Sequence, residues 1–410
     1  MKSCAGLVVA LLLPCACLQA AELGYRVAPT GQRACYDSTG ARVNCTGSGQ
    51  DAAFALRTLR YRNNADGTVS DLNTGLVWQQ AVGPKVSFAE ARSGAASLRL
   101  GGHSDWRLPT IKELYSLMDF SGSTPMPGRQ GKPFIDGAFD FRYGDSGAGE
   151  RIIDAQFWSA TEYVGRTMGR DDSVFGVNFA DGRIKSYPRT RPWRGDHRMF
   201  VRFVRGNPDY GRNEFIDNRD GTVSDRATGL MWMQIDSGQL KAGARGDGRM
   251  DWPQALAWAS QLSYAGHRDW RLPNAKELHS IVDYGRSPQI GGEPAIDPVF
   301  KSTPITDEGG KRNFGFYWTS TSHLDGREPG SSAVYMAFGE ALGFMRFAWT
   351  GQQPTLLDVH GAGAQRSDPK QGNPADFPEG MGPQGDVRRI YNLARLVRDM
   401  NLTQVTGDPQ

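Results

Sequence analysis

The stretch GHRDWRLPNAKELHSIVDY, residues 266–284, has a near copy at residues 102–120, which reads GHSDWRLPTIKELYSLMDF. In both copies Trp-Arg-Leu is predicted to be extended, because the residue before a proline is driven out of the helical region. Thr110 and Asn274 then each precede a glutamate by three residues, the pattern of a capping box at a helix start. The stretch therefore predicts an extended segment that leads into a helix, used twice.

The helices that follow are predicted to bury one apolar face in each copy. Apolar residues recur there at helical spacing: Ile111, Leu114, Leu117 and Met118, then Ala275, Leu278, Ile281 and Val282. We expect Arg107 and Arg271 to pair with an internal acid such as Asp105 or Asp269. We interpret the whole motif as a structural frame and not as a reactive site, with these residues in it: Asp105, Trp106, Arg107, Glu113, Asp269, Trp270, Arg271 and Glu277.

Four further blocks repeat in the same order, so the chain is interpreted as two copies of one unit. The first copy is assigned to residues 61–206 and the second to 215–404, with a linker at 207–214. The matching blocks are NNADGTVSDLNTGLVWQQ with DNRDGTVSDRATGLMWMQ, FWSATEY with YWTSTSH, FGVNFADGRIKSY with VYMAFGEALGFM, and FVRFVRG with LARLVRD.

The blocks predict an α+β fold. The Asp-Gly dipeptides at 66–67 and 220–221 indicate hairpin turns, so each first block is read as a two-stranded ribbon. FWSATEY and YWTSTSH are read as strands. The C-terminal RIYNLARLVRDM has the spacing of an amphipathic helix, but its match to FVRFVRG favours a closing strand. Each unit is thus expected to have two helices packed on small antiparallel sheets.

The N-terminus has the build of a secretory signal, residues 1–21, with cleavage expected near Ala20. A lipoprotein signal acylated at Cys15 or Cys17 is the alternative. The following segment, 22–60, holds Cys35 and Cys45, which we expect to form a disulfide in an oxidising compartment. The protein is therefore predicted to be exported to the periplasm, the cell surface or the medium, without a transmembrane span after signal removal.

Composition bounds the functional classes. A net charge of +3 without a concentrated basic face does not favour a nucleic-acid partner. The Asp-rich turns lack the twelve-residue calcium loop, and a second pair of zinc ligands is missing, so no metal and no cofactor are predicted.

The motifs DGTVSDLNTGLVW, DWRLPTIKEL, FWSATEY and FVRFVRG resemble a family of exported bacterial domains. It is known as DUF1566 and by the C-terminal domain of the Legionella collagen-like adhesin (Lcl). The resemblance covers about four fifths of the chain and implies a fold similar to C-type lectin-like domains and formylglycine-generating enzymes. It implies binding, including that of anionic glycans. The enzymes' copper-binding cysteine pair has no counterpart, because no cysteine follows Cys45.

The second copy carries a glycine- and proline-rich insertion at 358–386, and long loops are often functional. We select as candidate ligand-binding residues those whose side chains suit an anionic group or a sugar ring: Asp358, His360, Arg366, Asp368, Lys370 and, outside the insertion, Trp193. The competing interpretation is a self-bonded loop that covers a core or an interface.

Three functional hypotheses follow. The first is an exported, non-enzymatic binding or adhesion protein whose partner is a glycan or a surface protein. The second is a metal-dependent or hydrolytic enzyme that uses residues 358–370, and the third is a structural component of the envelope or an appendage. The sequence leaves the ligand and the oligomeric state open.

Overall fold

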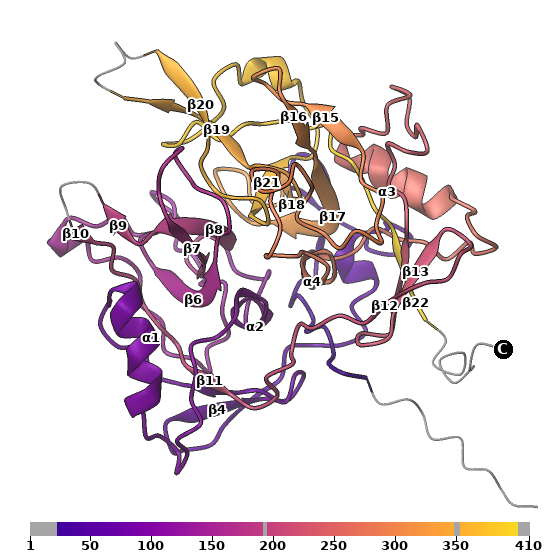
Figure 1. Cartoon of the computed structure of the whole chain (residues 1–410). Helices are drawn as coiled ribbons and strands as arrows, with labels where there is room; N and C mark the ends of the chain where they lie inside the picture. Colours follow the sequence, from indigo (N-terminus) through magenta and orange to yellow (C-terminus); the bar gives the residue numbers. More distant parts are fainter. Residues whose placement is uncertain (1–22, 192–194, 348–352, 401–410) are drawn as a thin grey trace, which may run out of the picture.

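The computed structural model describes residues 23–191, 195–347 and 353–400. The predicted signal, 1–21, and Trp193 lie outside these residues. Within this part of the chain, no helix has the length and apolar character needed to cross a membrane. The architecture is a set of small antiparallel sheets with four short α-helices among the described residues (Figure 1).

Each unit begins and ends in one small sheet. In the first unit the strand order is β11-β5-β4-β3, and in the second it is β12-β13-β14-β22. The predicted two-stranded ribbon is present as β4-β5 and β13-β14, and it is extended to four strands because a preceding strand and the closing strand pair with its two edges. The closing strand also replaces the helical alternative for the C-terminus. The bounds are β3 Tyr61–Asn63, β4 Thr68–Asp71, β5 Val77–Gln79, β11 Val204–Arg205, β12 Phe215–Asp217, β13 Thr222–Asp225, β14 Leu230–Met233 and β22 Val397–Asp399.

The two units share one six-stranded sheet of order β17-β18-β21-β8-β7-β6. The junction pairs Gln365 of β21 with Ile184 of β8, so each unit contributes three strands. The tandem copies therefore form one continuous structure and not two separate domains. The bounds are β6 Gln156–Glu162, β7 Ser173–Asn178, β8 Arg183–Pro188, β17 Phe316–His323, β18 Ser332–Ala337 and β21 Gln365–Pro369.

The third strand of the second unit is β21, and this corrects the alignment of GRIKSY with ALGFM. The residues of ALGFM instead lie in β19, Leu342–Arg346, which pairs with β20, Pro354–Asp358, in a separate hairpin. Figure 1 shows this hairpin projecting at the top of the molecule. The second unit thus has longer connections both before and after β21.

The remaining elements are short. They are two-stranded antiparallel hairpins and single turns of 3-10 helix that lie in the loops. Their bounds are β1 Cys35–Tyr36, β2 Arg42–Val43, β9 Thr190–Arg191, β10 Gly195–Asp196, β15 Pro304–Thr306, β16 Arg312–Phe314, η1 Asp51–Ala53, η2 Ser146–Ala148 and η4 Pro374–Asp376.

The helices begin where the sequence predicts. α1 (Phe88–Ser97), α2 (Ile111–Ser116), α3 (Trp252–Gln261) and α4 (Ala275–Ser280) all start at a complete capping box. In each box the cap side chain and the third residue satisfy each other's backbone N–H groups. The predicted apolar faces are buried, and one apolar cluster contains side chains of both units, including Trp78, Phe157, Trp232 and Tyr317. This cluster is therefore common to the two units, and each unit also has a smaller apolar cluster of its own.

The Lys of the repeated motif joins α2 to α4, which lie side by side at the centre of the molecule (Figure 1). Lys112 Nζ donates to the Ser280 carbonyl at 2.7 Å, and Lys276 Nζ donates to the Ser116 carbonyl at the same distance. Each lysine thus caps the last turn of the other unit's helix, where unpaired carbonyls carry partial negative charge. The repeated motif therefore supplies a central contact between the two units.

These lysines predict how stability depends on pH. Burial lowers the pKa of Lys112 to about 8 and that of Lys276 to about 7. An unfolded lysine titrates near pH 10.4, so above about pH 7 the unfolded state binds more protons and stability rises with pH. We expect the urea midpoint to rise between about pH 7 and 9, and to rise less in Lys276→Met. A midpoint that falls over this range in the wild type would contradict the assignment.

The N-terminal segment, residues 23–60, packs on the second unit. Its disulfide between Cys35 and Cys45 is present, as the sequence predicts. Lys370 Nζ donates to the carbonyl of Tyr36 at 2.7 Å, and the Gln32 amide bonds the backbone of Ser322. The segment is therefore part of the folded body.

Candidate functional site

The repeated Asp-Trp-Arg-Leu-Pro motif is a brace. The prediction that Arg107 and Arg271 pair with Asp105 or Asp269 is wrong. Arg107 instead bonds Glu113, and Arg271 bonds Glu277 at 2.7 and 2.8 Å. The reason is that the same glutamate closes the capping box, so one carboxylate ties the extended segment to the helix start. Trp106 and Trp270 are buried, as expected for a frame.

The closing strands supply the partners for the aspartates. Asp105 pairs with Arg205 at 2.7 Å, and Asp269 pairs with Arg398 at 2.8 Å. A second arginine just before each closing strand, Arg202 or Arg395, is fully buried and donates to backbone carbonyls. The closing block of each unit thus carries two arginines with different roles: one pairs with an aspartate, and the other is buried and bonds backbone carbonyls. Neither lines a reactive site.

The candidate residues Asp358 and His360 are buried. Asp358 accepts a 2.7 Å hydrogen bond from the Tyr163 hydroxyl of the first unit, and burial raises the pKa of Asp358 to about 7. His360 Nε2 lies 2.8 Å from Asp386, and burial lowers the pKa of His360 to about 4. The two side chains therefore have intramolecular partners and do not share an open site.

Arg366, Asp368 and Lys370 hold neighbouring segments. Arg366 pairs with Asp386, and Lys370 is fully buried against the N-terminal segment. Asp368 accepts from the backbone N–H groups of Arg389 and Ile390, both at 3.2 Å. These contacts agree with the interpretation of the insertion as a loop that bonds to the protein itself and covers its core. They also hold residues 386–390 in place. Within the described residues, no group of three or more His, Cys, Asp or Glu side chains could hold a metal ion.

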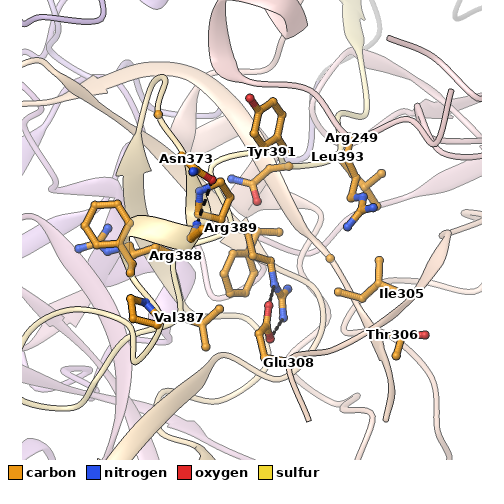
Figure 2. A pocket seen from close by; sticks show the side chains of 18 of the residues that line it. Arg249, Ile305, Thr306, Glu308, Asn373, Val387, Arg388, Arg389, Tyr391 and Leu393 are labelled. Carbon is orange, nitrogen blue, oxygen red and sulfur yellow. Dashed lines mark hydrogen bonds and ion pairs between the residues drawn. The ribbon is translucent and has the colours of Figure 1, made fainter. Parts of the chain in front are cut away.

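The chain fixed by Asp368 forms one wall of a cavity of about 700 Å³ in the second unit. The other walls come from the loop that carries Arg245 and Arg249, from β15 and its following turn, and from residues 372–378. Figure 2 shows the paired side chains of Arg389 and Glu308 between Val387 on one side and Ile305 and Thr306 on the other. The cavity is built mainly from segments that differ between the two units.

The cavity combines positive charge with aromatic faces. Among the described residues that line it are four arginines and one glutamate. Arg389 holds Glu308 at 2.9 and 3.0 Å and stacks on Phe316 with its guanidinium carbon 4.0 Å from the ring centroid. Although burial opposes the shift, this pairing lowers the pKa of Glu308. The remaining charge of the lining is therefore positive.

Arg245 and Arg249 are the exposed arginines of the lining, whereas Arg388 and Arg389 are half-buried. Arg245 lies over the Tyr391 ring at 4.8 Å, with its Nε 3.7 Å from Asp247, and Arg249 bonds the same Asp247 at 2.6 Å. A guanidinium on an aromatic face keeps donors free for a carboxylate or sulfate. The arrangement can therefore bind an anionic group beside a flat apolar surface.

The sequence reasoning missed this cavity. It selected the start of the insertion, whereas the lining comes from its second half, from 387–393 and from the 245–249 loop. A usable signal was the arginine content of segments that differ between the copies, ARGDGR at 244–249 and RR at 388–389.

Comparison with known proteins gives one family. The model of the Lcl C-terminal domain matches residues 67–205 and again 221–353, which together are well over half of the chain. We found no significant match among curated proteins or solved structures. The two matched segments lie within the two units, and the second match ends before β21 and β22. The chain thus belongs to the Lcl C-terminal domain family, with two copies of the domain.

Proposed function

We propose that this protein is an exported, non-enzymatic binding or adhesion protein that recognises an anionic polysaccharide through the arginine-lined cavity of its second unit. The observation that carries the proposal is the joint presence of four arginines and several aromatic rings in one cavity. Sugar rings stack on aromatic faces, and carboxylate or sulfate groups accept from guanidinium donors. The resemblance to C-type lectin-like folds agrees with this proposal, but fold alone does not carry it.

Binding is favoured over catalysis because the candidate catalytic side chains are occupied. Asp358, His360 and Asp386 are buried and bonded within the protein, away from the lining of the cavity. A general acid or base must be within hydrogen-bond reach of its substrate. The cavity supplies donors and apolar faces, which suit the recognition of a ligand.

A glycan array tests the proposal. At low salt we expect retention on sulfated or uronate-containing polysaccharides and little on neutral ones, and the signal should fall at high salt because exposed charges are screened. Binding to neutral glycans alone, or no binding at low salt, would reject the anionic ligand class.

A further inference from the structure

One face of the second unit is covered by the chain's own N-terminal segment. The side chain of Gln32 accepts from Ser322 N–H at 2.9 Å and donates to Ser322 C=O at 2.7 Å. The Thr30 carbonyl accepts from Phe120 N–H at 2.8 Å. Gln32 thus imitates a neighbouring strand at the edge of β17, as in β-strand addition.

Two further contacts anchor the segment there. The Thr321 hydroxyl donates to Asp51 at 2.6 Å, and the same hydroxyl oxygen accepts from the first N–H of α4. Lys370 lies 4.0 Å from the Trp252 ring centroid and donates to the carbonyls of Tyr36 and Asp37. Residues Ser320, Thr321 and Ser322 are consequently fully buried.

The strand registers identify the equivalent face of the first unit. Trp158 pairs with Gly176 as Trp318 pairs with Tyr335, so β6 superposes on β17 and β8 on β21. The residues in the places of Thr321, Ser322, Lys370, Trp252 and Phe120 are then Thr161, Glu162, Arg189, Phe88 and Tyr284.

This equivalent face keeps the same local chemistry. Thr161 accepts from the first N–H of α2 at 3.0 Å, as Thr321 does in α4, and the Arg189 guanidinium lies 5.4 Å from the Phe88 ring centroid. Tyr163 N–H bonds Ser173 of β7, so the alternation of an antiparallel pair points the N–H and C=O of Glu162 to the opposite side, the free edge. The groups that hold Gln32 and Asp51 in the second unit thus recur in the first.

The face is open in the first unit. Ala160 and Glu162 are exposed, whereas their counterparts in β17 are buried. A cavity of about 500 Å³ lies beside them, lined by Thr161 and Tyr284 together with the linker around Tyr210. Within the described residues, no segment fills the place that residues 30–37 and Asp51 take in the second unit.

We propose that this groove of the first unit, which is lined by Thr161 and Tyr284 and adjoins the exposed strand edge at Glu162, binds an extended polypeptide segment of another protein. The segment carries a side-chain amide that pairs with the backbone of Glu162 and a carboxylate that accepts from the Thr161 hydroxyl. In the second unit the chain itself supplies these groups, through Gln32 and Asp51. It is independent of the polysaccharide cavity.

A second copy of this chain is not the occupant. The N-terminal segment that would have to enter the groove is already bound to its own second unit through Gln32, Asp51 and the carbonyl of Tyr36. If this segment left its own second unit to bind the first unit of another copy, it would expose one face for each groove it filled. The number of contacts would not increase.

The test uses a fluorescent synthetic peptide of residues 26–37 that carries Cys35→Ser, added to the full-length protein. We expect saturable binding in fluorescence anisotropy, weakened at least about 5-fold by Gln32→Ala in the peptide, because a buried edge would lose its partner. In the protein, Gly285→Trp should weaken binding at least about 10-fold, since Gly285 lines the cavity and its φ suits other residues.

Gly137→Trp is the matched control, because a Cβ there meets nothing within 4 Å and Gly137 is outside the cavity. It should leave peptide binding unchanged. Absence of saturable binding at millimolar peptide, or equal binding by the Gly285→Trp protein, would overturn the proposal. A dimer in light scattering that Gly285→Trp dissociates would also overturn it, since a second copy would then be the occupant.

Discussion

Replacing Arg202 with methionine is expected to lower the free energy of unfolding by about 3–5 kcal/mol. The guanidinium is fully buried and donates to the carbonyls of Gln79, Gln80 and Asp140 at 2.5–2.6 Å. Methionine fills similar space but leaves three buried carbonyls without donors. Burial lowers the pKa of Arg202 to about 9, so part of this loss is offset by removal of a desolvated charge.

Arg205→Met is the control, three residues away in β11. Arg205 pairs with Asp105, whose side chain is 59% exposed, and an exposed ion pair contributes at most about 1 kcal/mol. Urea denaturation of both variants gives the comparison. Equal losses for the two substitutions would contradict a larger contribution of the buried Arg202 to stability.

The double variant Arg245→Ala/Arg249→Ala is expected to lose at least about 10-fold in affinity for an anionic polysaccharide. Each hydrogen bond to a charged group contributes about 1.5–3 kcal/mol, and a tenfold change corresponds to about 1.4 kcal/mol. Both side chains are exposed, so the thermal midpoint should change little. Arg388 and Arg389 are less suitable, because they also hold Asp368 and Glu308.

The control removes the same charge elsewhere. Arg92 and Arg99 are exposed on and after α1 of the first unit and do not line the cavity. Arg92→Ala/Arg99→Ala should retain at least half of the affinity, measured by isothermal titration calorimetry in the same buffer. An equal loss in both double variants would indicate a response to net charge and not to this site.

Local signals in the sequence predicted the frame well. The helix starts were predicted correctly from the prolines and from the capping pairs Thr110–Glu113 and Asn274–Glu277. The two residues of each capping pair are close together in the sequence, so the pattern can be recognised without the fold. The predicted partner of Arg107 was incorrect because the prediction considered only nearby residues. Asp105 is nearer in sequence, but only the structure shows that Asp105 faces Arg205, a hundred residues away.

Contacts between the copies could not be read from the repeats. The pairing of Gln365 with Ile184 and the reciprocal bonds of Lys112 and Lys276 depend on how two similar units meet. A repeat alignment compares the two copies but contains no information on the interface between them. It also placed the third strand at 342–346, because an inserted hairpin separates β21 from β18.

The site was only partly predictable. The insertion was correctly singled out as the region that differs, but charged residues at its start proved to be buried supports such as Asp368. The arginines that line the cavity come from two distant segments, 245–249 and 388–389, and their convergence is a property of the folded chain.

The most direct test of the account is to map where an anionic ligand binds. A sulfated oligosaccharide titrated into the isotope-labelled protein should shift amide resonances of the 245–249 loop and of residues 372–391, and leave β3–β5 of the first unit unchanged. Shifts confined to the first unit, or none at saturating ligand, would contradict the assignment of the binding site to the arginine-lined cavity.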